Sequence, residues 1–142
     1  MATLEIQGMD ELNAALGRIG TLPPEVKTRA LNQMADAARA AIKRSGESMG
    51  VRDRESDVHI LDKITTTKPK LSESGGHQDI TFSGSRRRGS TTTRNAEIAF
   101  INEYGKRGQP ARPFIGKAMN ENEERIAAAG GEVLGAWIEN EF

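Results

Sequence analysis

The stretch PPEVKTRALNQMADAARAAI, residues 23–42, decides the fold because it carries the strongest helical pattern in the chain. Its two prolines suit the first turn of a helix, where backbone N–H groups lack intrahelical partners. Apolar residues then recur every 3.6 residues, with basic residues outside their face; they are Val26, Ala30, Met34, Ala37, Ala38, Ala41 and Ile42. The small alanine side chains indicate close approach to another element, which favours a sheet over a cofactor. Ser45-Gly46 is predicted to end the helix.

Before this helix, Leu4 and Ile6 alternate with polar neighbours and predict a short strand. Asp10 is a favourable N-cap residue and predicts a short helix over residues 10–19. After the long helix, residues 58–67 and 80–82 predict two further strands.

Ala96–Glu103 is the best strand candidate, since apolar residues on both of its faces predict a central strand. From Pro113 onward, apolar residues at helical spacing predict a final helix. Gly130-Gly131 is expected to kink or divide it, because glycine destabilises a helix interior by about 1 kcal/mol.

The predicted order is therefore β-α-α-β-β-β-α, a single α+β domain over residues 1–142. We expect a small antiparallel sheet of about three or four strands, packed against the long alanine-rich N-terminal helix and a C-terminal helix. Residues 83–95, SGSRRRGSTTTRN, contain no apolar side chain. Such a segment has nothing to bury and is expected to be a flexible basic hairpin arm.

Composition excludes several classes of protein. The chain has no cysteine, so it holds no disulfide, thiol nucleophile or cysteine-based zinc site. Its clean apolar runs reach four residues, whereas a bilayer helix needs about 20. Its first residues are neither basic nor apolar, so no signal peptide is expected. These features are typical of a soluble globular protein made inside a cell.

Charge is balanced in sum, with 20 basic and 20 acidic residues, but it is uneven along the chain. Residues 39–94 carry twelve basic and seven acidic side chains, while residues 121–142 carry one and six. Random patchiness of a solvated surface is one interpretation. The other is that basic and acidic regions meet, within one chain or head-to-tail between copies, as in a ring. Apolar residues near the C-terminus, Trp137, Ile138 and Phe142, are the candidate subunit interface.

Catalytic patterns are missing from the sequence. His59 and His77 are too few for a zinc ligand set, and HExxH, P-loop and GxGxxG patterns do not occur. No serine lies in a GxSxG turn, although the members of a Ser-His-Asp triad need not be adjacent, so that alternative stays open. We expect no enzyme and assign no catalytic, cofactor-binding or metal-binding residue, and no cofactor.

Four arginines in the basic arm, Arg86, Arg87, Arg88 and Arg94, are candidates for contact with phosphate or a partner, because guanidinium groups bind phosphate without reading bases. No aromatic residue is interleaved with them for base stacking. A solvated hairpin tip is the simpler interpretation.

One region is more specific: AEIAFINEYG, residues 96–105, followed by a short basic loop and QPARPFIGKA, residues 109–118. Together with LEIQGMDEL at residues 4–12 and the alanine-rich helix, it resembles the tail-component family of tailed phages typified by gene product ten of phage Hong Kong 97. The residues predict a strand-to-helix corner built by Glu103, Tyr104, Gly105, Pro113 and Phe114. Pro113 suits the first helical turn, Gly105 allows a positive φ, and Phe114 is expected beside Phe100.

The resemblance implies a structural virion protein of a long-tailed phage, made in the host cytoplasm and located in the tail or neck. Such proteins act in tail completion or head–tail joining as rings, commonly six-fold, around the DNA channel. Implied partners are further copies, tail-tube or head-completion proteins, and DNA bound without sequence specificity, with no membrane. Two alternatives remain: a nucleic-acid-binding accessory protein that uses residues 83–95, and a small regulatory or toxin-like protein of a mobile element.

Overall fold

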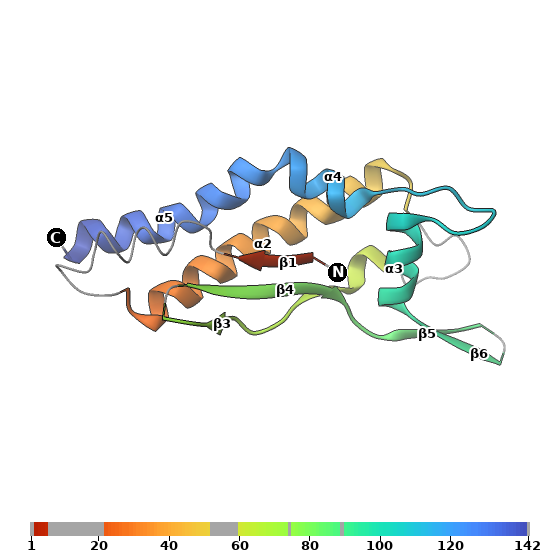
Figure 1. The fold of residues 1–142 in the computed structure, drawn as a ribbon, viewed down its shortest axis with the longest axis horizontal. Coiled ribbons are helices and arrows are strands. Elements are labelled where there is room, and N and C mark those ends of the chain that lie inside the picture. The colour runs from red at the N-terminus through yellow and green to blue at the C-terminus, as the bar shows by residue number, and fades with distance from the viewer. Residues whose placement is uncertain (1, 6–21, 52–59, 74, 89, 142) are drawn as a thin grey trace.

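The computed structural model describes residues 2–5, 22–51, 60–73, 75–88 and 90–141. It shows an α+β fold in which the long helix α2 (Pro24–Ser48) lies between a small antiparallel sheet and the helices α4 (Phe114–Glu121) and α5 (Glu123–Glu141) (Figure 1). The predicted fold class is therefore confirmed. The helix predicted over residues 10–19 lies outside the described residues.

Helix α2 forms where the sequence pattern places it, with Pro24 as its first residue and its apolar face buried. It runs to Ser48, so the predicted end at Ser45-Gly46 is wrong. Gly46 allows close packing, because a Cβ there would lie 2.5 Å from Leu61 Cδ2 and 3.2 Å from Phe114 Cδ2. The absent side chain lets two core residues pack directly against the helix backbone.

Strand β4 (Gly76–Phe82) is the centre of the main sheet. It pairs antiparallel with β1 (Ala2–Glu5) on one side and with β2 (Ile64–Thr66) and β3 (Lys70–Leu71) on the other. Alternate β4 residues, Gln78, Ile80 and Phe82, are buried, as the period of a strand requires. The strands predicted near residues 4 and 80–82 are confirmed. The one over residues 58–67 is correct only in part, because Ile60–Lys63 is a 3-10 helix, η1.

Two polar side chains buried between α2 and the sheet, Gln78 and Lys27, donate hydrogen bonds to oxygen acceptors on neighbouring segments. Gln78 Nε2 donates to the Thr67 carbonyl at 2.8 Å and to Asn32 Oδ1 at 3.2 Å. Lys27 Nζ donates to the carbonyls of Ser72 and Glu73 at 2.9 and 3.0 Å. Buried polar groups stabilise only when paired in this way, so these bonds fix how the sheet lies on the helix.

A second, two-stranded sheet projects from one end of the molecule (Figure 1): β5 (Ser85–Arg88) pairs antiparallel with β6 (Thr91–Arg94). The segment 83–95 thus contains a hairpin, but the expectation that it buries nothing is wrong. Arg86 and Asn95 are both buried, and Arg86 Nε donates to Asn95 Oδ1 at 3.1 Å. Asn95 Nδ2 donates to the Ser83 carbonyl at 2.7 Å and closes the hairpin base. Flexibility of the arm stays a prediction.

The strand predicted over residues 96–103 is wrong, because Asn95–Tyr104 is a helix, α3. A run of eight residues with apolar side chains at 98–101 fits both the two-residue period of a strand and the 3.6-residue period of a helix. Periodicity therefore did not decide between strand and helix here. Gly105 follows the last helical residue with φ 78°, and its N–H donates to the Ile101 carbonyl at 2.7 Å. A glycine just after a helix is a C-terminal signal, and here it ends α3.

The final helical region is divided at Asn122, not at Gly130-Gly131 as predicted. The Asn122 main-chain N–H and side-chain Nδ2 both donate to the Ala118 carbonyl, at 3.1 and 2.9 Å, and end α4 there. Helix α5 continues through both glycines. Gly130 faces α2, where a Cβ would lie 2.7 Å from Met34 Sδ, so this glycine allows the two helices to approach.

Candidate functional site

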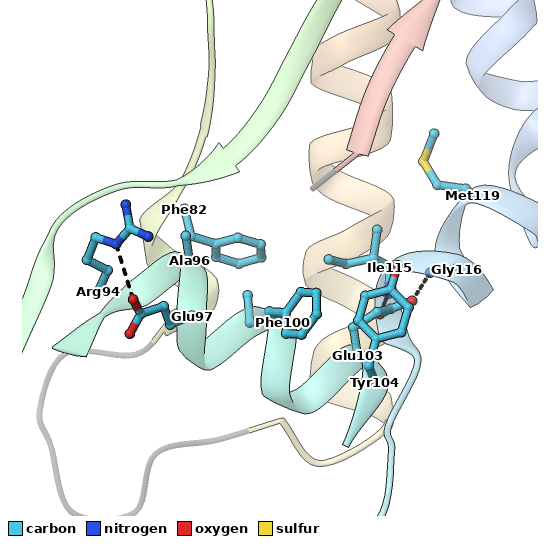
Figure 2. A pocket seen from close by; sticks show the side chains of 11 residues that line it. Phe82, Arg94, Ala96, Glu97, Phe100, Glu103, Tyr104, Ile115, Gly116 and Met119 are labelled. Carbon is cyan, nitrogen blue, oxygen red and sulfur yellow. Dashed lines mark hydrogen bonds and ion pairs between the residues drawn. The ribbon is translucent and has the colours of Figure 1, made fainter. Parts of the chain in front are cut away.

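The predicted strand-to-helix corner is wrong in its first element, because the residues that precede Gly105 form the helix α3 and the connection joins two helices. Glu103 lies in the last turn of α3 and faces the first turn of α4 (Figure 2). Its Oε2 accepts the Ile115 N–H at 2.8 Å and its Oε1 accepts the Gly116 N–H at 2.9 Å. Pro113, the N-cap residue of α4, provides no side-chain hydrogen bond. Glu103 therefore supplies the cap from the neighbouring helix, and its negative charge suits the helix N-terminus.

The connection between the two helices is held along its length. Lys106 and Gln109 exchange main-chain hydrogen bonds of 2.9 Å in both directions. The Arg112 N–H donates to the Asn102 carbonyl at 2.6 Å, and Arg112 Nη1 donates to the Gly50 carbonyl at 3.0 Å. The basic loop thus folds back onto α3 and reaches the end of α2.

Phe114 is fully buried at the start of α4, as predicted. Its ring meets Phe82 of β4 edge to face, with centroids 6.1 Å apart. The expected neighbour, Phe100, is instead 59% exposed, and its ring contacts that of Tyr104. The helical form of α3 explains this correction, because it buries Ala99 and turns Phe100 outward beside Tyr104.

Replacing Glu103 by alanine is expected to lower the free energy of unfolding by about 1–2 kcal/mol, since two N–H groups of α4 lose their acceptor. Urea unfolding of the full chain measures this loss. Glu97→Ala is the matched control, because Glu97 is exposed and its ion pair, at 3.4 Å, is with exposed Arg94. That control should change stability by about 0.5 kcal/mol or less. Equal effects of the two substitutions would contradict a capping role for Glu103.

An apolar groove lies between α3 and α4, with a volume of about 460 Å³ (Figure 2). Phe100 and Tyr104 stand along it with ring centroids 4.7 Å apart, 59% and 66% exposed. The other lining residues are Phe82, Ala96, Ala99, Ile115, Gly116 and Met119, together with charged Arg94, Glu97 and Glu103. The strand interpretation missed this groove. The i, i+4 spacing of Phe100 and Tyr104 was the available signal, since residues so spaced meet on a helix.

A second hollow of about 360 Å³ lies between α3 and the hairpin and is more polar. Arg86, Lys106 and Arg112 line it, together with Thr93 and Asn102. Two of these cations are engaged within the fold, Arg86 with Asn95 and Arg112 with the Gly50 carbonyl. The hollow therefore belongs to the packing of the hairpin against α3.

The four candidate arginines do not form one surface. Arg87 and Arg94 are exposed, whereas Arg86 is buried. The register pairs Arg86 with Thr93 and Arg87 with Thr92, and successive strand residues face opposite sides of the hairpin. On the side of the hairpin opposite to Arg86, the exposed cations among the described residues are Arg87 and Arg94.

The C-terminal candidates also differ in their surroundings. Trp137 is half-buried and packs with Val133 and Leu134 against the buried pair Leu22 and Val26. Its indole therefore contributes to the subunit's own packing. Ile138 is half-buried, and Phe142 lies outside the described residues.

No family model, no curated protein and no solved structure matches this chain. Within the described residues, no group of three or more His, Cys, Asp or Glu side chains could hold a metal ion. The described helices include none long and apolar enough to cross a membrane.

Proposed function

We propose that this chain is a structural virion protein of a long-tailed phage or prophage, acting in tail completion or head–tail joining as a ring around the DNA channel. The observation that carries the proposal is the corner. The residues on which the resemblance rests act together there: Glu103 caps α4, Gly105 ends α3 with a positive φ, and Phe114 anchors α4 in the core. These contacts give the motif residues one common structural role, which supports the proposal.

The distribution of charge supports assembly between copies. The hairpin and the basic loop lie toward one end of the elongated molecule, and the C-terminal end of the acidic helix α5 lies at the other (Figure 1). The exposed side chains include Arg87, Arg94, Lys106 and Arg107 in the basic region, against Glu132 and Glu139 on α5. Opposite ends of opposite charge favour head-to-tail contact, which closes into a ring when the rotation allows.

The test is the assembly state of the purified full chain. We expect rings, six-fold by the resemblance, in negative-stain micrographs, with a matching mass by light scattering. In a phage or prophage that carries the gene, its interruption should leave heads and tails that do not join or complete. A chain that remains monomeric at every concentration, and whose loss leaves particles intact, would contradict the proposal.

The alternative function, binding of nucleic acid through the basic arm, predicts a different result, namely DNA binding that depends on salt. If the arm binds phosphate, the logarithm of DNA affinity should fall linearly with the logarithm of salt concentration, by about 0.9 for each phosphate neutralised. Arg87→Ala with Arg94→Ala should then reduce that slope by about 2. Arg125→Ala on the acidic helix α5 is the control and should leave it unchanged. Such binding without rings would favour the accessory-protein function.

A further inference from the structure

The polar hollow where the hairpin packs against α3 is lined by positively charged side chains. Its volume of about 360 Å³ lies within the usual range of ligand pockets, about 300–1,000 Å³. Three cations line it: Arg86 from β5, and Lys106 and Arg112 from the loop that connects α3 and α4. None of the described lining residues carries a carboxylate. This lining favours an anionic ligand over a neutral or cationic one.

Two of the three cations are held in position by uncharged oxygen atoms. Arg86 Nε donates to Asn95 Oδ1 at 3.1 Å, and Arg112 Nη1 donates to the Gly50 carbonyl at 3.0 Å. Neither acceptor carries a charge, so these two bonds orient the guanidinium groups without neutralising them. Each guanidinium has further N–H donors, and a group that is already oriented loses less conformational freedom when it binds a ligand.

Lys106 belongs to a hydrogen-bonded turn. Its main chain exchanges 2.9 Å hydrogen bonds with Gln109 in both directions, and Gly108 within the turn has a φ of 83°. These are main-chain bonds, so they place the turn without using the Lys106 ammonium group, and the residue is exposed. The surrounding segment, residues 104–120, carries four cations and no anion. The turn therefore brings a cation to the hollow without a neighbouring carboxylate in its own segment.

The remaining walls strengthen the attraction for an anion. Val51 and Ile60, each 1% exposed, line the hollow together with Ile98 and Ile101 of α3. Apolar walls lower the local dielectric, and charges attract each other more strongly there than in water. Thr93 also lines the hollow and pairs with Arg86 in the hairpin register, so its hydroxyl adds an uncharged donor beside the guanidinium.

We propose that this hollow binds a phosphate group. Several cations together favour phosphate over a carboxylate, because phosphate offers more acceptor oxygens and can carry two charges. Guanidinium groups bind those oxygens in pairs, and an ammonium group adds a point charge. The phosphate group comes either from a small molecule or from a nucleic-acid backbone, since both present the same oxygens. The inference does not depend on association between copies, so it goes beyond the proposed function.

The first experiment titrates the full chain with inorganic phosphate and with pyrophosphate in a calorimeter. We expect saturable binding of both, and weaker binding of acetate at the same ionic strength. Lys106→Gln should weaken phosphate binding by about tenfold or more, the usual effect of losing a charged hydrogen-bonding group. Thr93→Val, which keeps the shape and removes the hydroxyl, should weaken it by about fivefold.

The matched control is Lys117→Gln, which removes the same charge from an exposed position on α4 outside the hollow. It should leave phosphate affinity within about twofold of the parent, because an exposed charge away from the site is screened by salt. Lys106 is exposed and its side chain is not part of the turn's hydrogen bonds, so Lys106→Gln should fold as the parent does. Circular dichroism verifies the fold of all three variants.

A labelled DNA duplex distinguishes the two sources of phosphate. If the hollow holds a backbone phosphate, the duplex should bind, pyrophosphate should displace it, and Lys106→Gln should weaken both. If it holds a small phosphate ligand, pyrophosphate should bind and the duplex should not compete. Either result supports the inference. Absence of saturable phosphate and pyrophosphate binding would overturn it, as would equal affinity for acetate or equal losses in Lys106→Gln and Lys117→Gln. Ring formation is measured separately, so these failures leave the proposed function standing.

Discussion

Replacing Phe114 by alanine is expected to lower the free energy of unfolding by about 3–5 kcal/mol, the usual range for a buried phenylalanine. The ring is fully buried, packs edge to face with Phe82, and lies against the glycine backbone of α2 at Gly46. Its removal leaves a cavity where α2, α4 and β4 meet. Urea unfolding followed by circular dichroism measures the loss.

Phe100→Ala is the control for this prediction, because Phe100 belongs to the same residue type and is 59% exposed. It should cost about 1 kcal/mol or less. Phe114→Leu, which retains most of the volume, should cost less than Phe114→Ala and keeps the test interpretable if the alanine variant does not fold. A loss below about 1 kcal/mol for Phe114→Ala would contradict its role as the anchor of the corner.

Replacing Gly105 by alanine is expected to cost about 2–3 kcal/mol. Its φ of 78° and ψ of 175° lie in a region that glycine alone adopts readily. A Cβ would also lie 2.8 Å from the Ala111 nitrogen and 3.0 Å from the Gln109 carbonyl oxygen. Both are backbone atoms of the loop that connects α3 and α4. The substitution therefore strains the corner twice, and thermal or urea unfolding should report both effects.

Gly108→Ala separates these two causes. Gly108 also has a positive φ, 83°, but a Cβ there meets no atom of the described residues within 4 Å. It should cost only the backbone strain, about 1 kcal/mol. Equal losses at the two positions would show that the close approach of the loop to Gly105 contributes nothing.

Local sequence signals determined several parts of the structure. The prolines and the 3.6-residue pattern located α2, and alternation around Ile80 and Phe82 located β4. A long periodic pattern is a reliable signal, because it places many apolar side chains on the same face of a helix. The residue chemistry around Gly105 and Phe114 likewise predicted the positive φ and the buried ring.

Short and ambiguous segments were decided by the tertiary structure. Residues 96–103 fit a strand and a helix equally well. The helix forms where Asn95 is bonded to the hairpin base and to Arg86, and where Glu103 meets the N-terminus of α4. These partners are 9 to 13 residues apart in sequence, so no local pattern contains them. The aromatic groove follows from the helix and was missed with it.

The sequence by itself therefore determined the α+β class, the long helix and a strand around Ile80 and Phe82. Only the tertiary structure decided how the two adjacent glycines of α5 differ. Gly130 faces Met34 of α2, whereas Gly131 faces outward with no described neighbour within 4 Å. Both have the same local propensity, which predicted a kink. Packing along α2 instead keeps α5 helical through both, because burial against a neighbouring helix outweighs a propensity cost of about 1 kcal/mol per glycine.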